Sequence, residues 1–367
     1  MDFKFKIGTR VIFGKNCIKN NKNELCRFGA RALIVTGKRS GKSSGALDDV
    51  VSVLENENVA FEIYDEIENN PSLENVFLGA EIAKRFGADY IIGVGGGSPL
   101  DASKAIAVLA VNDIEPLELY KNVFKNKPLP IIAVPTTAGT GSEVTPYSIL
   151  TRNDIKTKMS FGNEDTFPVI AFMDAAYTET MPYEVTVNTA VDALSHAVEG
   201  YLSRRSTPMS DVFALGSIQA FSGCLQNLLN NSFDWNSREK LLYAAMLGGM
   251  TISHTGTTIV HGLGYSLTYF KNIPHGKANG LLLGEYLKYI YDNAKEKIDR
   301  VINELKLGSV DEFGRLMDRL VKTDISLSEE EISQYASLGM KQKSASYNVR
   351  SVTEQDLAGI LRRSVKR

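Results

Sequence analysis

Cysteine and long apolar stretches are both scarce in this sequence. The three cysteines, Cys17, Cys26 and Cys224, are scattered and form no CxxC pair. Scattered thiols in odd number are typical of a reduced, cytosolic protein and argue against a metal held by cysteine. No window approaches about 20 uninterrupted apolar residues, and residues 1–10 lack the apolar core of a signal peptide. We therefore expect a cytoplasmic protein without a membrane-spanning helix.

An excess of charge of one sign is also missing. The formal net charge is −2 over 367 residues, with 23% charged and 43% apolar residues. This balance gives no general attraction to nucleic acid or to anionic lipid, so neither is an expected partner. At roughly 150 residues per domain, the length indicates two domains.

Short apolar runs alternate with helical segments through the first half. We expect a hairpin over residues 3–13, strands over 31–36, 60–64, 89–94, 129–135 and 169–174, and helices over 45–57, 72–86 and 99–111. Continuous apolar strands between helices predict a parallel sheet covered on both faces. From Met181 onward the apolar residues follow a helical period, which predicts an all-helical second half. The predicted domains are therefore 1–177 (α/β) and 178–367 (all-helical), joined tightly.

The segment Thr36 to Ser43, TGKRSGKS, follows a predicted strand and is close to a P-loop. A P-loop requires a glycine, four residues and then Gly-Lys-Ser or Gly-Lys-Thr, so that backbone N–H groups surround a phosphate. Gly41, Lys42 and Ser43 fit this pattern, but Gly37 lies one residue too close. No convincing Walker B acid follows an apolar strand. A P-loop NTPase is therefore an alternative rather than the main interpretation.

Two glycine-rich turns each follow an apolar strand. The first, GVGGGSPLD (93–101), opens a predicted helix, where glycine lets a pyrophosphate approach the backbone and its free N–H groups. It departs from the GxGxxG fingerprint at Ser98, and a tight turn capped by Ser98 or Asp101 is the alternative. The second is PTTAGTGSE (135–143). Two such turns at the carboxyl ends of parallel strands predict a nucleotide site.

Histidine is rare, and its positions are informative. The chain has four, and Asp192 and His196 are spaced to share one face of a helix. With His261 and His275 they form a set of one carboxylate and three imidazoles, which suits Fe²⁺ or Zn²⁺. The alternative is an ordinary Asp–His pair with structural histidines elsewhere. We expect His254 to be a hydrogen-bonding residue of a helix rather than a ligand.

Taken together, GGGSPLD, PTTAGTGSEVT, VDALSHAVEGYLS and HGLGYSL…PHGKANG resemble the iron-containing (group III) alcohol dehydrogenases. The resemblance runs over essentially the whole chain. It implies a dehydroquinate synthase-like architecture, with a Rossmann-like domain for the nicotinamide cofactor, an all-helical metal-binding domain and catalysis in the cleft between them. It also implies hydride transfer to or from a short-chain primary alcohol or aldehyde, assisted by the metal, in a homodimer or larger homo-oligomer.

The resemblance further implies roles for individual residues. The family's metal ligands fall on Asp192, His196, His261 and His275. Its cofactor contacts fall on Asn70, Gly95, Gly96, Gly97, Ser98, Asp101, Thr136, Thr137, Thr140, Gly141 and Lys158. Its substrate pocket falls on Tyr147 and Ile252. Tyr265 stands where many members have a histidine proton relay, and because a tyrosine has a pKa near ~10 we expect it mainly to line the pocket.

The near-miss P-loop bears on the choice of cofactor. Members that prefer NAD often have an aspartate at the position of Gly37, where it binds the ribose hydroxyls and repels a 2′-phosphate. Here Gly37 is surrounded by the donors Lys38, Arg39, Ser40 and Lys42. We therefore predict NADP(H) over NAD(H), with a solvated basic turn as the alternative.

Two rival functions belong to other classes. A dehydroquinate-synthase-like lyase shares the fold, NAD and a metal, but needs a denser set of basic residues around a phosphorylated sugar acid than the second half shows. A non-catalytic nucleotide-binding protein would require an empty metal site.

Overall fold

The chain folds into two compact units. The structure is a computed structural model that describes residues 3–322 and 324–365. One unit spans Lys6–Met181, and the other comprises the chain from Pro182 onward together with the N-terminal stretch up to Phe5.

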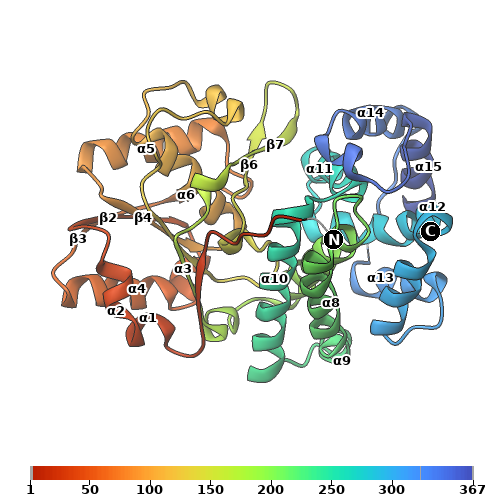
Figure 1. Cartoon of the computed structure of the whole chain (residues 1–367), viewed down its shortest axis with the longest axis horizontal. Coiled ribbons are helices and arrows are strands. Elements are labelled where there is room, and N and C mark those ends of the chain that lie inside the picture. Colours follow the sequence, from red (N-terminus) through yellow and green to blue (C-terminus); the bar gives the residue numbers. More distant parts are fainter. Residues whose placement is uncertain (1–2, 323, 366–367) are drawn as a thin grey trace. The chain divides into compact units, whose positions relative to one another are not determined.

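A parallel sheet is the centre of the N-terminal unit (Figure 1). Within the described residues its strand order is β1-β8-β5-β4-β2-β3, and every pairing in it is parallel. The strands are β1 (Arg10–Phe13), β2 (Arg31–Gly37), β3 (Ala60–Ile67), β4 (Tyr90–Gly95), β5 (Ile131–Pro135) and β8 (Ile170–Met173). The parallel sheet that the apolar runs predicted is confirmed.

Helices cover both faces of this sheet because successive strand residues point to opposite sides. Ile34 and Ile92 pack with helices α1, α2 and α4, whereas their neighbours Leu33 and Ile91 pack with α5 and α6. The helices are α1 (Cys17–Asn20), α2 (Lys22–Cys26), α3 (Ser40–Ser43), α4 (Ala46–Asn56), α5 (Leu73–Phe86) and α6 (Gly97–Leu109). Short 3-10 turns lie at Pro116–Lys121, Ser142–Val144, Glu164–Thr166 and Ala175–Thr178.

Two details of this unit differ from the sequence prediction. The hairpin expected over residues 3–13 is wrong, because β1 pairs in parallel with β8 and residues 3–9 form no strand. The alternating segment leaves the sheet instead, and the ring of Phe5 stacks on those of Phe213 and His254. A hairpin does form later, between β6 (Ser148–Arg152) and β7 (Thr157–Phe161), where none was expected.

The C-terminal unit is helical, as predicted. Its helices are α7 (Tyr183–Tyr201), α8 (Pro208–Ser222), α9 (Leu225–Asn230), α10 (Trp235–Thr255), α11 (Ile259–Lys271), α12 (His275–Glu304), α13 (Val310–Leu320), α14 (Glu329–Met340) and α15 (Glu354–Val365), with a 3-10 turn at Lys343–Tyr347. The buried helix α7 packs against α8, α10 and α12. Pro182 and Pro274 precede α7 and α12, where a missing N–H costs nothing. No helix of the described residues has both the length and the apolar character that a membrane span requires.

Candidate functional site

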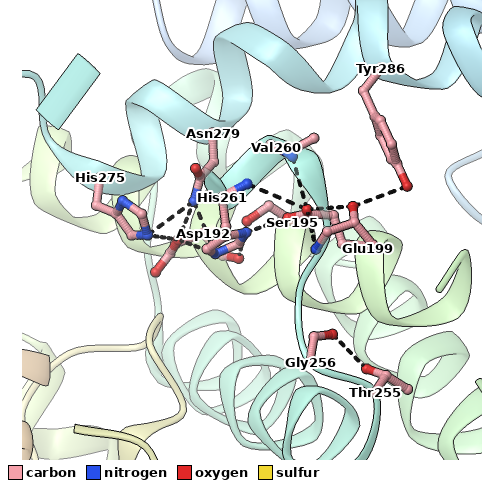
Figure 2. Close-up of polar contacts among 11 residues, drawn as sticks. Asp192, Ser195, Glu199, Thr255, Gly256, Val260, His261, His275, Asn279 and Tyr286 are labelled. Carbon is pink, nitrogen blue, oxygen red and sulfur yellow. Dashed lines mark hydrogen bonds and ion pairs between the residues drawn. The ribbon is translucent and has the colours of Figure 1, made fainter. Parts of the chain in front are cut away.

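One carboxylate and two imidazoles, from three different helices, meet inside the C-terminal unit (Figure 2). Asp192 lies in α7, His261 in the first turn of α11, and His275 at the start of α12. Asp192 Oδ1 is 3.8 Å from His261 Nε2 and 3.9 Å from His275 Nε2. Two donors bound to one tetrahedral Zn²⁺ lie about 3.4 Å apart, so these atoms are close to the spacing that a shared ion imposes.

The side-chain amide of Asn279 lies among these three atoms. Its Nδ2 is 3.0 Å from Asp192 Oδ1, 3.1 Å from His261 Nε2 and 3.3 Å from His275 Nε2. The NH₂ group can only donate and has two hydrogens, so it serves at most two of these three acceptors at once, and an Nε2 that accepts from it directs its lone pair toward this point. Neutral imidazoles with a free lone pair are the form that binds a metal. The donor set therefore fits a divalent cation.

Electrostatics keep the central carboxylate ionised. Burial raises the pKa of Asp192, but the Coulombic attraction of His196, His275 and His261 in their protonated form, together with the Asn279 amide, outweighs burial and lowers this pKa. A carboxylate must be deprotonated to bind a metal, so Asp192 is already in the state that binding requires.

The other two histidines lie differently. His196 is buried one turn after Asp192, and its ring stacks on that of His261 with centroids 4.7 Å apart. Among the described residues, the donor group compact enough for one ion contains Asp192, His261 and His275, so His196 lies beside this group rather than in it. His254 lies on α10, outside the group, where it stacks on Phe5.

Glu199 was missed by sequence reasoning although it contacts this group. It is buried on α7, and its carboxylate is bonded to Nδ1 of His261 and to the backbone N–H groups of Thr258 and Val260. Burial raises its pKa, but the bonds to His261 and Thr258 outweigh burial and lower it. The sequence could have indicated Glu199, because spacings of four and then three residues place Asp192, His196 and Glu199 on one helical face.

In the N-terminal unit, the predicted cofactor turns follow adjacent strands. Gly37 ends β2, Gly95 ends β4, and Thr136 follows β5, while β2, β4 and β5 are neighbours in the sheet. The chain runs outward from β2 to the edge strand β3 and then returns to β4, so the strand order reverses between β2 and β4. Sheets of this class bind ligands at such a switch point.

The two glycine-rich turns pack closely against one another. A Cβ atom on Gly96 would lie 3.2 Å from Cγ2 of Thr137, and one on Gly97 would lie 2.6 Å from Cγ2 of Thr140. Gly95 has φ 147°, which side chains disfavour. Glycine at these positions therefore lets the side chains of Thr137 and Thr140 pack directly on the backbone at the start of α6.

A second group of predicted cofactor residues is connected by hydrogen bonds. The backbone N–H of Asn70 donates to Ser98 Oγ at 3.2 Å, and Lys158 Nζ donates to Asn70 Oδ1 at 2.5 Å. Asp101 is different, because its buried carboxylate accepts from Ser142 Oγ at 2.5 Å and from the N–H of Ile149 at 3.0 Å. Asp101 thus ties α6 to the second glycine turn, which also contains Gly141 in a left-handed conformation.

The lysines around Gly37 are exposed and face acidic residues of β3. Lys38 Nζ is 2.7 Å from Glu66, and Lys42 Nζ is 2.7 Å from Asp65. Ser40 lies near the first glycine turn, since its Oγ is 3.4 Å from the Cβ position of Gly95.

Family comparison covers both units. A family model described as iron-containing alcohol dehydrogenase matches residues 8–175, and one described as the C-terminal part of the Fe-containing alcohol dehydrogenase family matches 186–365. The chain belongs to the iron-containing alcohol dehydrogenases. It is 35% identical over 291 residues to lactaldehyde reductase of Escherichia coli (strain K12), covering 78% of this chain and 75% of that protein.

Two further similarities span most of the chain. The NADPH-dependent butanol dehydrogenase of Clostridium saccharobutylicum is 30% identical over 332 residues, which cover 89% of this chain and 83% of that one. A crystal structure of an iron-containing alcohol dehydrogenase from Thermotoga maritima is 39% identical, with a TM-score of 0.93 and 99% of each chain covered. The resemblance found in the sequence motifs is confirmed.

Membership of the iron-containing alcohol dehydrogenases implies the use of Fe²⁺ and NAD(P). The relatives are named for reactions of alcohols and aldehydes, which supports an oxidoreductase. It favours a dehydrogenase over the lyase and P-loop alternatives.

Tyr265 lies one turn after His261, against the ring of His275. Of the two predicted pocket residues, Tyr147 is in the N-terminal unit, where its carbonyl accepts from Lys104 Nζ at 2.6 Å, and Ile252 is buried on α10 of the C-terminal unit.

Proposed function

We propose that this protein transfers a hydride between NADP(H) and a short-chain primary alcohol or aldehyde with the help of a divalent metal. The observation that carries the proposal is the convergence of Asp192, His261 and His275 on one buried point. Residues 1–177 would hold the cofactor, and 178–367 would hold the metal. We also predict a homodimer or larger assembly and a cytoplasmic location.

Residues of the helical unit would bind the metal or orient its ligands. Asp192, His261 and His275 are the proposed ligands of Fe²⁺ or Zn²⁺, with His196, which lies beside them, as the predicted fourth. The ion would supply a Lewis acid that lowers the pKa of the alcohol. Asp192 contributes the negative charge, and Asn279 keeps its carboxylate oriented through the 3.0 Å hydrogen bond. Burial of Asp192 and His261 keeps water from competing for these side chains.

The residues of the α/β unit would hold the dinucleotide, which supplies the two-electron acceptor or donor. The start of α6, with glycine at Gly96 and Gly97, would offer backbone N–H groups to the pyrophosphate. Asn70 and Lys158 contribute polar atoms beside this turn. The remaining proposed contacts come from Gly95, Gly96, Gly97, Ser98, Thr136, Thr137, Thr140 and Gly141, with Asp101 as a support for the turn and Tyr147 and Ile252 as proposed pocket residues.

A preference for NADP(H) is supported by the turn after β2. Gly37 has no carboxylate to repel a 2′-phosphate, and a Cβ atom there would already lie 3.3 Å from the carbonyl oxygen of Ile67. The ion pairs of Lys38 and Lys42 are exposed, so they contribute little and a phosphate can replace their partners. One relative bears the name NADPH-dependent butanol dehydrogenase.

The test is oxidation of reduced cofactor by a short aldehyde, followed through the absorbance of the nicotinamide. We expect anaerobically Fe²⁺-loaded protein to oxidise NADPH with higher kcat/KM than NADH, and chelator-treated protein to lose this activity until Fe²⁺ is restored. A Gly37→Asp variant should move the ratio toward NADH. Equal or better efficiency with NADH in the wild type would refute the NADP(H) preference, and activity that survives complete metal removal would refute the metal role.

A further inference from the structure

Glu199 is fully buried on α7 and surrounded by hydrogen-bond donors (Figure 2). Its Oε1 accepts from the backbone N–H groups of Thr258 at 2.8 Å, Val260 at 3.1 Å and His261 at 3.4 Å, and from the Thr258 hydroxyl at 2.7 Å. Its Oε2 is bonded to Nδ1 of His261. Thr258 makes no side-chain cap for α11, so Glu199 caps this helix and also holds the ring of a residue in its first turn.

These contacts determine which ring nitrogen of His261 carries the proton. Backbone N–H groups can only donate, so Oε1 must accept, and the start of a helix favours a negative charge beside it. A carboxylate oxygen at Oε2 requires a proton on Nδ1 of His261. Nε2 then keeps its lone pair, and this atom is the one that lies 3.8 Å from Asp192 Oδ1.

Asn279 imposes the same requirement from the other edge of the ring. Its Nδ2 is 3.1 Å from His261 Nε2 and 3.0 Å from Asp192 Oδ1. The nitrogen rather than the oxygen of the amide must face this side, because rotation would bring the amide oxygen against a carboxylate oxygen. Contacts on opposite edges of one imidazole therefore select the same tautomer.

We propose that Glu199 is a positioning residue that holds His261 with its proton on Nδ1 and its Nε2 lone pair directed at the metal-binding point. The inference rests on the proposed function and adds a residue that acts through a ligand. A carboxylate that accepts from the far nitrogen of a ligating histidine fixes the ring and raises its basicity, and loss of such a partner typically weakens metal binding about 10- to 100-fold.

Glu199→Gln is the most informative variant. It keeps the length of the side chain and an oxygen that can accept from the N–H groups of α11. Its NH₂ group would face Nδ1 of His261 and, as a donor, would favour a lone pair there, in opposition to Asn279, whose amide favours one on Nε2. Glutamine therefore preserves the cap and removes the acceptor that fixes the proton on Nδ1.

The first measurement needs neither metal nor turnover. NMR of labelled ring nitrogens in metal-free protein should show His261 protonated on Nδ1 in the wild type and a loss of this single tautomer in Glu199→Gln. With four histidines in the chain, variants of single histidines can assign the signals. A wild-type His261 with its proton on Nε2 would overturn the proposal without any Glu199 variant.

The second measurement uses Co²⁺ as the probe. Titration followed by visible absorbance, with a competing chelator, should show about 10- to 100-fold weaker binding in Glu199→Gln at a similar melting temperature. Thr258→Val is the matched control, because it removes one donor to the same carboxylate and leaves the ring contact intact. We expect it to bind Co²⁺ nearly as tightly as the wild type.

The outcomes separate this proposal from the function on which it rests. An unchanged tautomer with unchanged Co²⁺ affinity in Glu199→Gln would overturn the role of Glu199 and leave the metal site standing. Equal weakening by Thr258→Val and Glu199→Gln would also overturn it, because the loss would then come from packing. If the wild type bound no Co²⁺, the proposed function would fail at its metal, and the NMR result would still decide whether Glu199 sets the tautomer.

Discussion

The ring of Tyr265 stacks on the imidazole of His275, with the centroids 5.3 Å apart and the planes inclined by 16°. Tyr265 lies on α11 and His275 begins α12, so the stack connects the helices that carry two proposed ligands. The hydroxyl is not needed for this contact. The stacking is therefore consistent with a tyrosine that lines the site rather than one that relays a proton.

We expect Tyr265→Phe to keep nearly all of the turnover at neutral pH, because the stacked ring remains. A working proton relay contributes about 100-fold or more, so a loss of that size would contradict the lining role. The measurement is kcat at saturating cofactor across neutral pH. Tyr265→Leu is the companion variant, and because it removes a stack worth about 0.5–1.5 kcal/mol it should weaken Co²⁺ binding by a few-fold to about tenfold.

The buried acid Glu143 predicts a pH-dependent stability. It lies in the 3-10 turn after the second glycine-rich stretch, and burial raises its pKa from 4.5 to about 7. A backbone hydrogen bond and the charge of Lys104 lower the pKa against burial, Asp101 raises it, and about 7 is the balance of these effects. Between these two pH values the folded protein keeps a proton that the unfolded chain has released. Stability from this group is therefore fully present below pH 4.5 and is lost as the pH rises through about 7.

Glu143→Gln should remove this pH dependence, because an amide stays neutral. The free energy of unfolding of the wild type should fall relative to that of the variant by up to about 3 kcal/mol between about pH 5 and about pH 8. Urea unfolding of both proteins at intervals over this range measures the difference. A constant difference between the two proteins across the range would show that Glu143 does not titrate there.

The hydrogen bond between Lys158 and Asn70 predicts an effect on cofactor binding. Lys158→Met keeps the apolar stem and removes the Nζ that donates to Asn70 Oδ1. As a proposed cofactor contact, a charged Nζ contributes about 1.5–3 kcal/mol to binding, so we expect KM for the dinucleotide to rise about tenfold or more with little change in kcat. Lys156→Met is the control, since Lys156 is exposed in the turn that precedes β7. Equal KM values for both variants would argue against a cofactor role for Lys158.

The sheet could be predicted because its strands are buried on both faces. A run such as Tyr90–Gly95 is continuously buried, and short continuous apolar runs that alternate with helices are typical of a parallel sheet. The β6–β7 hairpin left no such signal, because its buried apolar residues Leu150 and Phe161 stand among threonines, lysine and arginine. The hairpin expected at residues 3–13 was wrong because apolar and polar residues alternate there as in a strand, but β1 pairs with the distant strand β8 and not with a neighbour in sequence.

The candidate site likewise contains residues that the sequence predicts and residues that only the packing of helices brings together. Helical spacing placed Asp192 and His196 together, because that relationship lies within one turn of one helix. Glu199 and His261 are 62 residues apart and come together only because α7 packs beside the start of α11. No sequence pattern indicated Asn279. Its place among the donors follows from the way α12 packs against α7.

The contact of Phe5 with Phe213 and His254 has a topological consequence. The N-terminal stretch belongs with the helices, so the helical unit is discontinuous in sequence and the α/β unit is an insertion between Phe5 and Pro182. A fragment that begins at Pro182 would lack this aromatic partner. Protease dissection of the two units would accordingly require two cuts in the chain rather than one.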